Sequence, residues 1–235
     1  MSEALPPLTS SKVAAAGELH DTLSRWVLTD SALRTLRDQV DGFDEAACVL
    51  KVVTLNDLYG TNVYTTVPLA QSMSRILAGK RRHELVSETL GSTLAVLPGG
   101  NGDRVRTLTS FASKFCHFFI DEHRFPIYDE AACASIKAHL GKSALTEDGG
   151  RYELFCAAFR QLQKPVRCTT KTLDHYLWIA GMYLRWSSGT AKAKYVNREL
   201  SELFDQPGAR SDLLMSVVAD SPKGIVKKKP RGSRG

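Results

Sequence analysis

Apolar positions recur every three to four residues along most of the chain, which predicts a succession of helices. The first is predicted over residues 12–27, where the spaced apolar positions are Val13, Leu19, Leu23, Trp26 and Val27. Asp30 and Ser31 are good N-cap residues, so a second short helix is predicted after them, ending near Val40. No strand-like alternation of any length interrupts the pattern, which favours an all-α fold.

The same periodicity continues to the C-terminal part of the chain. Further helices are predicted over residues 43–59, 66–78, 84–96, 129–140, 152–163, 172–186, 191–204 and 211–218, and another carries Lys114. Clusters of glycine and polar residues at 98–102 and 146–150 predict loops. We expect a disordered N-terminus over residues 1–12, one helical domain over residues 13–218 and a flexible basic tail over residues 219–235.

The most informative stretch runs from Leu108 to Ile136. Lys114 lies among four phenylalanines, where burial disfavours the charged amine and favours a neutral nucleophile. A polar bend at 121–124 and the sequence Phe-Pro-Ile-Tyr then lead to Asp129, which is predicted to cap a new helix and to keep its negative charge there. Two simpler interpretations stay open: the lysine extends its head to solvent, and the aspartate only starts a helix.

Two segments of this stretch resemble the helix-hairpin-helix DNA glycosylases. Leu108-Thr-Ser-Phe-Ala-Ser-Lys114-Phe-Cys is similar to their hairpin pattern Leu-Pro-Gly-Val-Gly-x-Lys-Thr-Ala, and Phe125-Pro-Ile-Tyr-Asp129 is similar to Val-Pro-Val-Asp. The resemblance implies that Lys114 and Asp129 are the catalytic pair, and that Ser110 and Ser113 contact DNA from the hairpin. Ser110 and Ala112 stand where the family has glycines.

A second resemblance concerns the turn Leu58-Tyr-Gly-Thr-Asn62-Val-Tyr64, which is similar to the first conserved loop of the superfamily. It implies that Asn62 fills the gap left by an extruded base, with Tyr59 and Thr61 as neighbouring DNA contacts. The alternative is a plain helix C-cap turn at Gly60. Lys80, Arg81 and Arg82 form a basic cluster that is suited either to phosphate contact or to a solvated corner.

The third resemblance lies in the aromatic segment TLDHYLWIAGMYLRW, in which Asp174 and Trp178 share one helix face. It is similar to the archaeal 8-oxoguanine glycosylases, and it implies a base pocket formed by Asp174, Trp178 and Phe118. Stacking on aromatic rings and hydrogen bonding to a carboxylate suit a flipped base. The alternative is that the aromatic stripe belongs to the core.

Composition narrows the class of protein. The net charge is +6, of which residues 220–235 contribute +5, so a basic tail suited to phosphate contact follows an almost neutral body. The five cysteines are scattered singly, which excludes an iron–sulfur or zinc site built on clustered cysteines. We predict no metal and no cofactor. No apolar run is long enough to span a bilayer and no leader pattern is present, so we expect a cytoplasmic protein, associated with the nucleoid when bound to DNA.

Together the resemblances imply two helical lobes flanking a DNA-binding cleft, with a central lobe over residues 62–125 and a second lobe formed by 13–61 and 126–218. The implied function is a monomeric DNA N-glycosylase that excises a modified base from double-stranded DNA, with AP lyase activity if Lys114 forms a Schiff base. Its role would be base-excision repair or removal of modified bases from phage DNA. The alternatives are a non-catalytic DNA-binding or partner-binding protein on the same scaffold, and a structural helical domain with a disordered basic tail.

Overall fold

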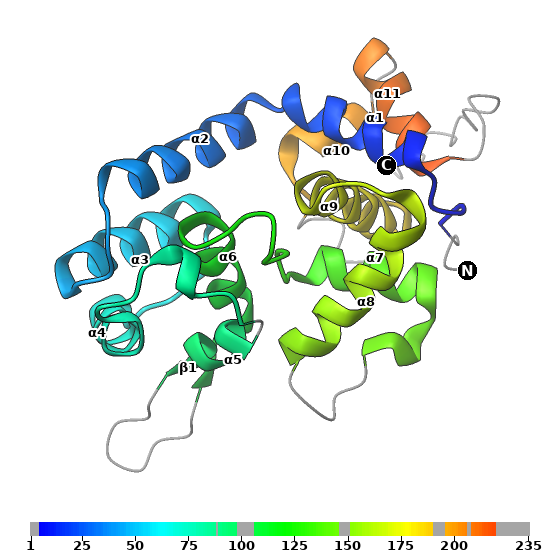
Figure 1. Cartoon of the computed structure of the whole chain (residues 1–235). Coiled ribbons are helices and arrows are strands. Elements are labelled where there is room, and N and C mark those ends of the chain that lie inside the picture. Colours follow the sequence, from blue (N-terminus) through cyan, green and yellow to red (C-terminus); the bar gives the residue numbers. More distant parts are fainter. Residues whose placement is uncertain are drawn as a thin grey trace, which may run out of the picture.

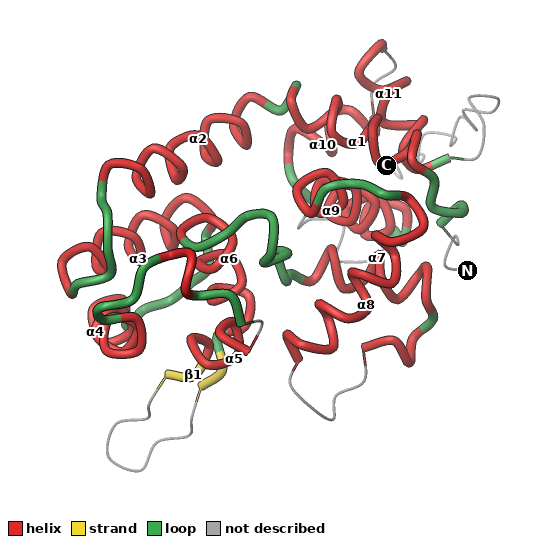
Figure 2. Tube along the Cα trace, viewed as in Figure 1, coloured by secondary structure: helices red, strands yellow, loops and turns green. Residues whose placement is uncertain are grey.

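The structure, a computed structural model, describes residues 5–87, 89–97, 106–145, 151–189, 196–205 and 208–219. Its α-helices are α1 Ser10–Asp21, α2 Ser24–Gln39, α3 Glu45–Tyr59, α4 Thr66–Leu77, α5 Thr89–Ala95, α6 Thr109–Phe119, α7 Glu130–Leu140, α8 Arg151–Val166, α9 Thr170–Ser187, α10 Arg198–Asp205 and α11 Ala209–Val218. The short 3-10 helices are η1 Arg82–Glu84 and η2 Lys142–Leu145. β1 Val96–Leu97 and β2 Arg106–Thr107 pair antiparallel, with Val96 opposite Thr107. The predicted all-α fold class is confirmed (Figures 1 and 2).

The helices form two groups (Figure 1). In one, α3 packs on α4 and α6, and α2 packs on α3 and α6. In the other, α9 packs on both α7 and α1, and α1 also packs on α11. The groups are joined where α1 leads into α2 and where α6 leads into α7. This grouping places α2 and α3 with the central helices, whereas the central lobe was predicted to begin at residue 62.

The two N-terminal helices divide at a different point from the predicted one. The chain breaks at Thr22 and Leu23, and α2 begins at Ser24, so Asp30 is not an N-cap. Asp30 is buried within α2, where its carboxylate accepts a hydrogen bond from the Tyr59 hydroxyl at 2.8 Å. The prediction of disorder over residues 1–12 is also wrong for its later part, because Leu5 is buried in the core and α1 starts at Ser10.

The central stretch folds as its pattern predicts. Lys114 lies in the second turn of α6, a bend follows at 121–124, and α7 begins after Asp129. Every side chain of residues 111–119 is buried, since this helix passes through the middle of its group. Gly60 ends α3 in the left-handed conformation that a C-cap requires, with φ +57°.

Several predicted features lie outside the described residues, namely the loops at 98–102 and 146–150 and the basic tail at 220–235. Among the helices that the structure describes, none combines the length and the apolar character needed to cross a membrane.

Helices α7 and α9 approach each other closely at Gly181. A Cβ atom added at Gly181 would lie 2.1 Å from the carbonyl oxygen of Ala131, so no side chain fits at this point. Backbone cannot yield as a flexible side chain can, so Gly181 fixes how closely α9 approaches the first turn of α7.

We expect Gly181→Ala to destabilise the protein by roughly 1–3 kcal/mol, because the added methyl group forces the two helices apart. Gly17→Ala is the matched control, since a Cβ there meets Thr172 at an ordinary 3.6 Å. It should be neutral or stabilising by roughly 0.5–1 kcal/mol, because alanine is the better helix former. Urea unfolding followed by circular dichroism measures both, and equal midpoints for the two variants would contradict the packing constraint.

Candidate active site

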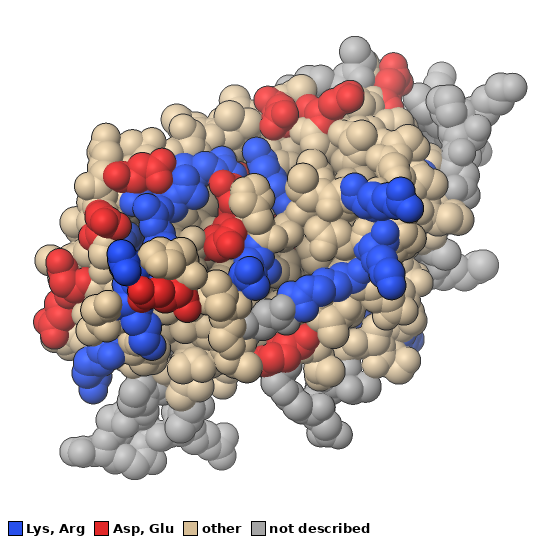
Figure 3. Space-filling view, in the orientation of Figure 1, with Lys and Arg blue, Asp and Glu red and all other residues tan. Residues whose placement is uncertain are grey.

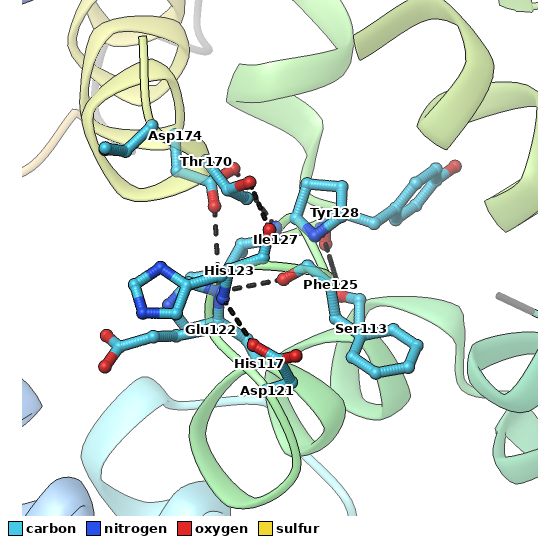
Figure 4. A network of polar contacts seen from close by, with 12 residues as sticks. Ser113, His117, Asp121, Glu122, His123, Phe125, Ile127, Tyr128, Thr170 and Asp174 are labelled. Atoms are coloured by element: carbon cyan, nitrogen blue, oxygen red, sulfur yellow. Dashed lines mark hydrogen bonds and ion pairs between the residues drawn. The ribbon is translucent and has the colours of Figure 1, made fainter. Parts of the chain in front are cut away.

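The segment Phe125–Tyr128 lies between the polar bend and α7, and side chains from α6, α8 and α9 form hydrogen bonds with its backbone. Figure 4 shows the partners from α6 and α9. Ser113 and His117 come from α6, Tyr152 from α8 and Asp174 from α9. The Ile127 N–H donates to Asp174 at 3.1 Å, the Tyr128 N–H to Ser113 at 3.0 Å, and the carbonyls of Phe125 and Pro126 accept from His117 and Tyr152, each at 2.8 Å. These bonds determine where Asp129 lies at the end of the segment.

Charged groups anchor the preceding bend to α2. Glu122 lies 2.9 Å from the Arg34 guanidinium and 3.6 Å from that of Arg37. The Thr170 hydroxyl, at the start of α9, donates to the carbonyl of His123. Both helix groups therefore hold the connection between Lys114 and Asp129.

Lys114 is 5% exposed, and its ammonium donates to the hydroxyl and carbonyl oxygens of Ser110 at 2.8 and 3.3 Å. Burial lowers the pKa of this amine from its ordinary 10.5, although Asp129 and Asp174 oppose the shift. The Tyr59 ring lies 5.8 Å from Nζ. The predicted desolvation of the lysine is thus present.

Asp129 is the N-cap of α7, with its carboxylate accepting from the Ala132 N–H at 2.7 Å. Among the described residues Asp129 forms no direct ion pair with Lys114, but its negative charge opposes the lowering of the Lys114 pKa. Both side chains line one cavity of about 350 Å³. A substrate within this cavity can therefore contact the amine and the carboxylate together.

The cavity lies where the two helix groups meet. One face of α9 lines it with residues that recur at helical spacing: Lys171, Asp174, His175, Trp178, Met182 and Arg185. The opposite walls come from α1, α2 and α3 through His20, Trp26, Asp30 and Tyr59. The structure thus brings together Lys114, Asp129, Asp174 and Trp178, which the sequence analysis selected from separate segments.

Aromatic rings form much of the wall. The Trp26 ring packs on those of Tyr59 and Trp178, with centroids 5.4 and 5.2 Å apart. Phe118, predicted as the stacking residue, does not line the cavity; it lies behind Tyr59 with its ring centroid 5.4 Å away. Tyr59, predicted as a DNA contact beside Asn62, lines the cavity.

Asp174 has one engaged and one unengaged oxygen. Oδ1 accepts from the Ile127 N–H, whereas Oδ2 is buried without a hydrogen-bond partner among the described residues. His117 lies 3.7 Å from Oδ2, but its Nδ1 bonds the Phe125 carbonyl, and burial lowers the pKa of His117 to about 4, so the imidazole is neutral. Burial also raises the pKa of Asp174 well above 3.8, although the Ile127 N–H opposes the shift.

The remaining predicted DNA contacts have varied environments. Asn62 is exposed, with φ 56°. The Thr61 hydroxyl donates to the Asn56 side chain, which also forms hydrogen bonds with the backbone N–H and C=O of Val63. Asn56 fixes this turn, and its role was missed because it lies inside a helix pattern. The prediction for Ser113 as a DNA contact is wrong, since it is fully buried against Tyr128.

The glycine hairpin is replaced by different local structure. Leu108 is the N-cap of α6, and residues 109–113 form the first turns of that helix. Ser110 faces the lysine amine, so its hydroxyl is engaged within the protein. Lys114 therefore lies in the second turn of α6, and this helix follows the short strand pair β1–β2.

The basic cluster at residues 80–82 is partly neutralised. Arg81 pairs with Glu84 at 3.4 Å and Arg82 with Asp38 at 3.9 Å, whereas Lys80 is exposed and makes no ion pair among the described residues. Acidic side chains are interspersed with basic ones over the face drawn in Figure 3. The surface that the structure describes is thus mixed in charge on this face.

Sequence reasoning missed three buried polar residues of the cavity wall: His20, Asp30 and His175. His20 lies in an amphipathic pattern that also fits a surface helix, Asp30 was interpreted as an N-cap, and His175 stands beside the selected Asp174. For the two histidines, a polar residue on the apolar face of a predicted helix was the signal available.

Comparison with known proteins gives limited information. The family model HI_0787_N, described as an N-terminal domain, matches residues 12–123, slightly less than half of the chain. The match spans α1 to α6, including Lys114, and ends in the bend before Asp129. No curated protein and no solved structure matches the chain.

The N-cap role of Asp129 can be separated from the effect of its charge by substitution. Asp129→Ala should destabilise the protein by about 1 kcal/mol, since the Ala132 N–H loses its acceptor, whereas Asp129→Asn should keep the cap and most of the stability. Chemical unfolding of both variants checks this difference. Equal losses in the two variants would show that the carboxylate charge, rather than the cap, stabilises α7.

Proposed function

We propose that the protein is a DNA N-glycosylase that takes an extruded base into the cavity and cleaves its bond to the sugar. The observation that carries the proposal is the shared cavity of Lys114, Asp129, Asp174 and Trp178. An amine with a lowered pKa, an acid at a helix N-terminus and aromatic walls are the groups such a reaction uses. The resemblance to helix-hairpin-helix glycosylases supports the same reaction.

The chemistry follows from the two side chains. The lone pair of neutral Lys114 forms a bond to C1′ of the deoxyribose, while the bond from C1′ to the base breaks and the base leaves with that electron pair. Asp129 stabilises the positive charge that develops on the sugar ring. Loss of a proton from nitrogen and opening of the sugar then give a Schiff base, from which β-elimination cleaves the strand.

A monofunctional route uses the same cavity. Asp129 would direct a water molecule onto C1′, and Lys114 would then contribute only to the shape and charge of the site. The two routes differ in whether a covalent protein–DNA species forms.

The substrate class is a modified base in double-stranded DNA. The aromatic walls suit stacking, and Asp174 Oδ2 is an unengaged polar atom in the wall. Free bases released from DNA of several sources can be identified by mass spectrometry. Sensitivity to DNA-damaging agents or to phage challenge then separates a repair role from a defence role.

One observation favours a non-catalytic DNA-binding function. The first turns of α6 stand in place of the glycine hairpin that would grip the DNA backbone, and Ser110 is turned to the lysine. A non-catalytic protein would bind DNA with strong salt dependence, and neither Lys114→Met nor Asp129→Asn would change its affinity.

The covalent route can be tested without knowing the base. A duplex carrying an abasic site offers the aldehyde directly, so borohydride should trap the wild-type protein on DNA, and Lys114→Met should abolish the adduct because the attacking amine is lost. The trapped species is measured by denaturing gel electrophoresis. Lys51→Met is the matched control: Lys51 is also buried, at 2%, but it bonds the Gly42 carbonyl and does not line the cavity.

Trapping should persist in Lys51→Met. Adducts of equal yield in all three proteins would show that surface lysines react, and they would contradict the covalent route. Base release in the mass-spectrometric assay, without any adduct on the abasic duplex, would assign the reaction to water and Asp129.

The pH dependence gives an independent test of the nucleophile. Only the neutral amine attacks, so the trapping rate should rise with pH and level off below the ordinary lysine pKa of 10.5, because burial lowers the pKa of Lys114. Asp129, Asp174 and Cys133 are the ionisable groups acting against that shift. A rate that keeps rising through the ordinary lysine range would show a solvated amine; single-turnover trapping at matched ionic strength measures it.

A further inference from the structure

Two histidines at the cavity wall have unsatisfied polar atoms. His20 on α1 and His175 on α9 are 7% and 8% exposed, and Nδ1 of each is buried without a hydrogen-bond partner. Neither imidazole makes a hydrogen bond within the part of the chain that the structure describes. Leaving buried polar groups unpaired is costly, so both rings indicate a bound species that supplies the missing contacts.

A carboxylate completes the cluster. Asp30 on α2 is 6% exposed, and its oxygen lies with one nitrogen of each histidine in a group whose members are all within 4.8 Å of one another. The three residues come from three helices and line the same cavity. Oδ1 of Asp30 accepts a hydrogen bond from the Tyr59 hydroxyl, whereas Oδ2 lies 3.7 Å from the Arg34 guanidinium.

We infer that His20, Asp30 and His175 form a binding site for a divalent transition-metal ion, with an open coordination position toward the cavity. Two imidazoles and one carboxylate are a donor set that zinc and its neighbours accept. A single ion can satisfy both imidazoles and the acid at once. The site is independent of the glycosylase proposal, since it uses neither Lys114 nor Asp129.

The orientation of the histidine rings and the nearby charges both affect metal binding at this cluster. The two histidine rings are stacked, with their centroids 3.5 Å apart and an angle of 8° between their planes. A metal ion lies in the plane of each imidazole that binds it, so one ring must turn when the ion binds. Arg34 and Lys171 bring positive charge near His20, but Glu122 compensates Arg34 at 2.9 Å, and Asp21 acts on His20 with the opposite sign. The negative groups around the site thus offset its cations.

The test uses the full-length protein without an affinity tag and with Zn²⁺ as the probe. Calorimetric titration should give one bound equivalent and an increase in Tm, and His20→Asn, His175→Asn and Asp30→Asn should each weaken binding at least tenfold. His83→Asn is the control, because this exposed histidine lies outside the cluster and its loss should leave affinity unchanged. Circular dichroism establishes that each variant is folded.

A second measurement needs no variant. Co²⁺ added to the wild-type protein should give visible absorption typical of nitrogen and oxygen ligands, without the charge-transfer band of a thiolate, and it should quench tryptophan fluorescence because Trp178 packs on His20. Absence of Zn²⁺ binding at micromolar concentration overturns the inference. Binding that survives unchanged in His20→Asn and His175→Asn, or a thiolate spectrum, overturns it equally.

Discussion

The segment between Lys114 and Asp129 requires partners for its backbone, and this requirement organises the interior of the protein. Phe125–Tyr128 passes between the two helix groups, where water cannot serve every N–H and C=O group. Ser113, His117, Tyr152 and Asp174 supply the partners instead. Three helices are thereby fixed relative to one short segment, and the position of the acid relative to the amine follows from that network.

Polar groups beside the cavity have partners, whereas several in its wall have none among the described residues. The Phe125 and Pro126 carbonyls, next to the cavity, accept hydrogen bonds, whereas Asp174 Oδ2 and the Nδ1 atoms of His20 and His175, in the wall, have no partner there. Unpaired buried polar atoms reduce stability, by roughly 1–3 kcal/mol each. Proteins keep such losses chiefly where a ligand or a reaction makes use of them, and here all three residues line the same cavity.

Local sequence patterns predicted local structure well and distant contacts poorly. The path from Lys114 through a bend to Asp129 could be predicted, because helix periodicity, a proline and an N-cap residue each act over a few neighbours. Asp30 was mistaken for an N-cap, because its partner Tyr59 lies on another helix and no local rule reveals the pairing. Tyr59 rather than Phe118 lines the cavity for a similar reason. Helix spacing indicates which residues share a face, but not which aromatic ring reaches the cavity.

The contact between Gly181 and Ala131 also has a consequence for motion. The backbone of Gly181 packs directly on the backbone of Ala131, and no side chain between them can change rotamer. We therefore expect α7 and α9 to move together. Because α1 also packs on α9, any widening of the cavity for a bulky ligand then requires movement of the facing wall formed by α2 and α3. Thr22 and Leu23, where the first two helices meet, are the natural pivot for that displacement.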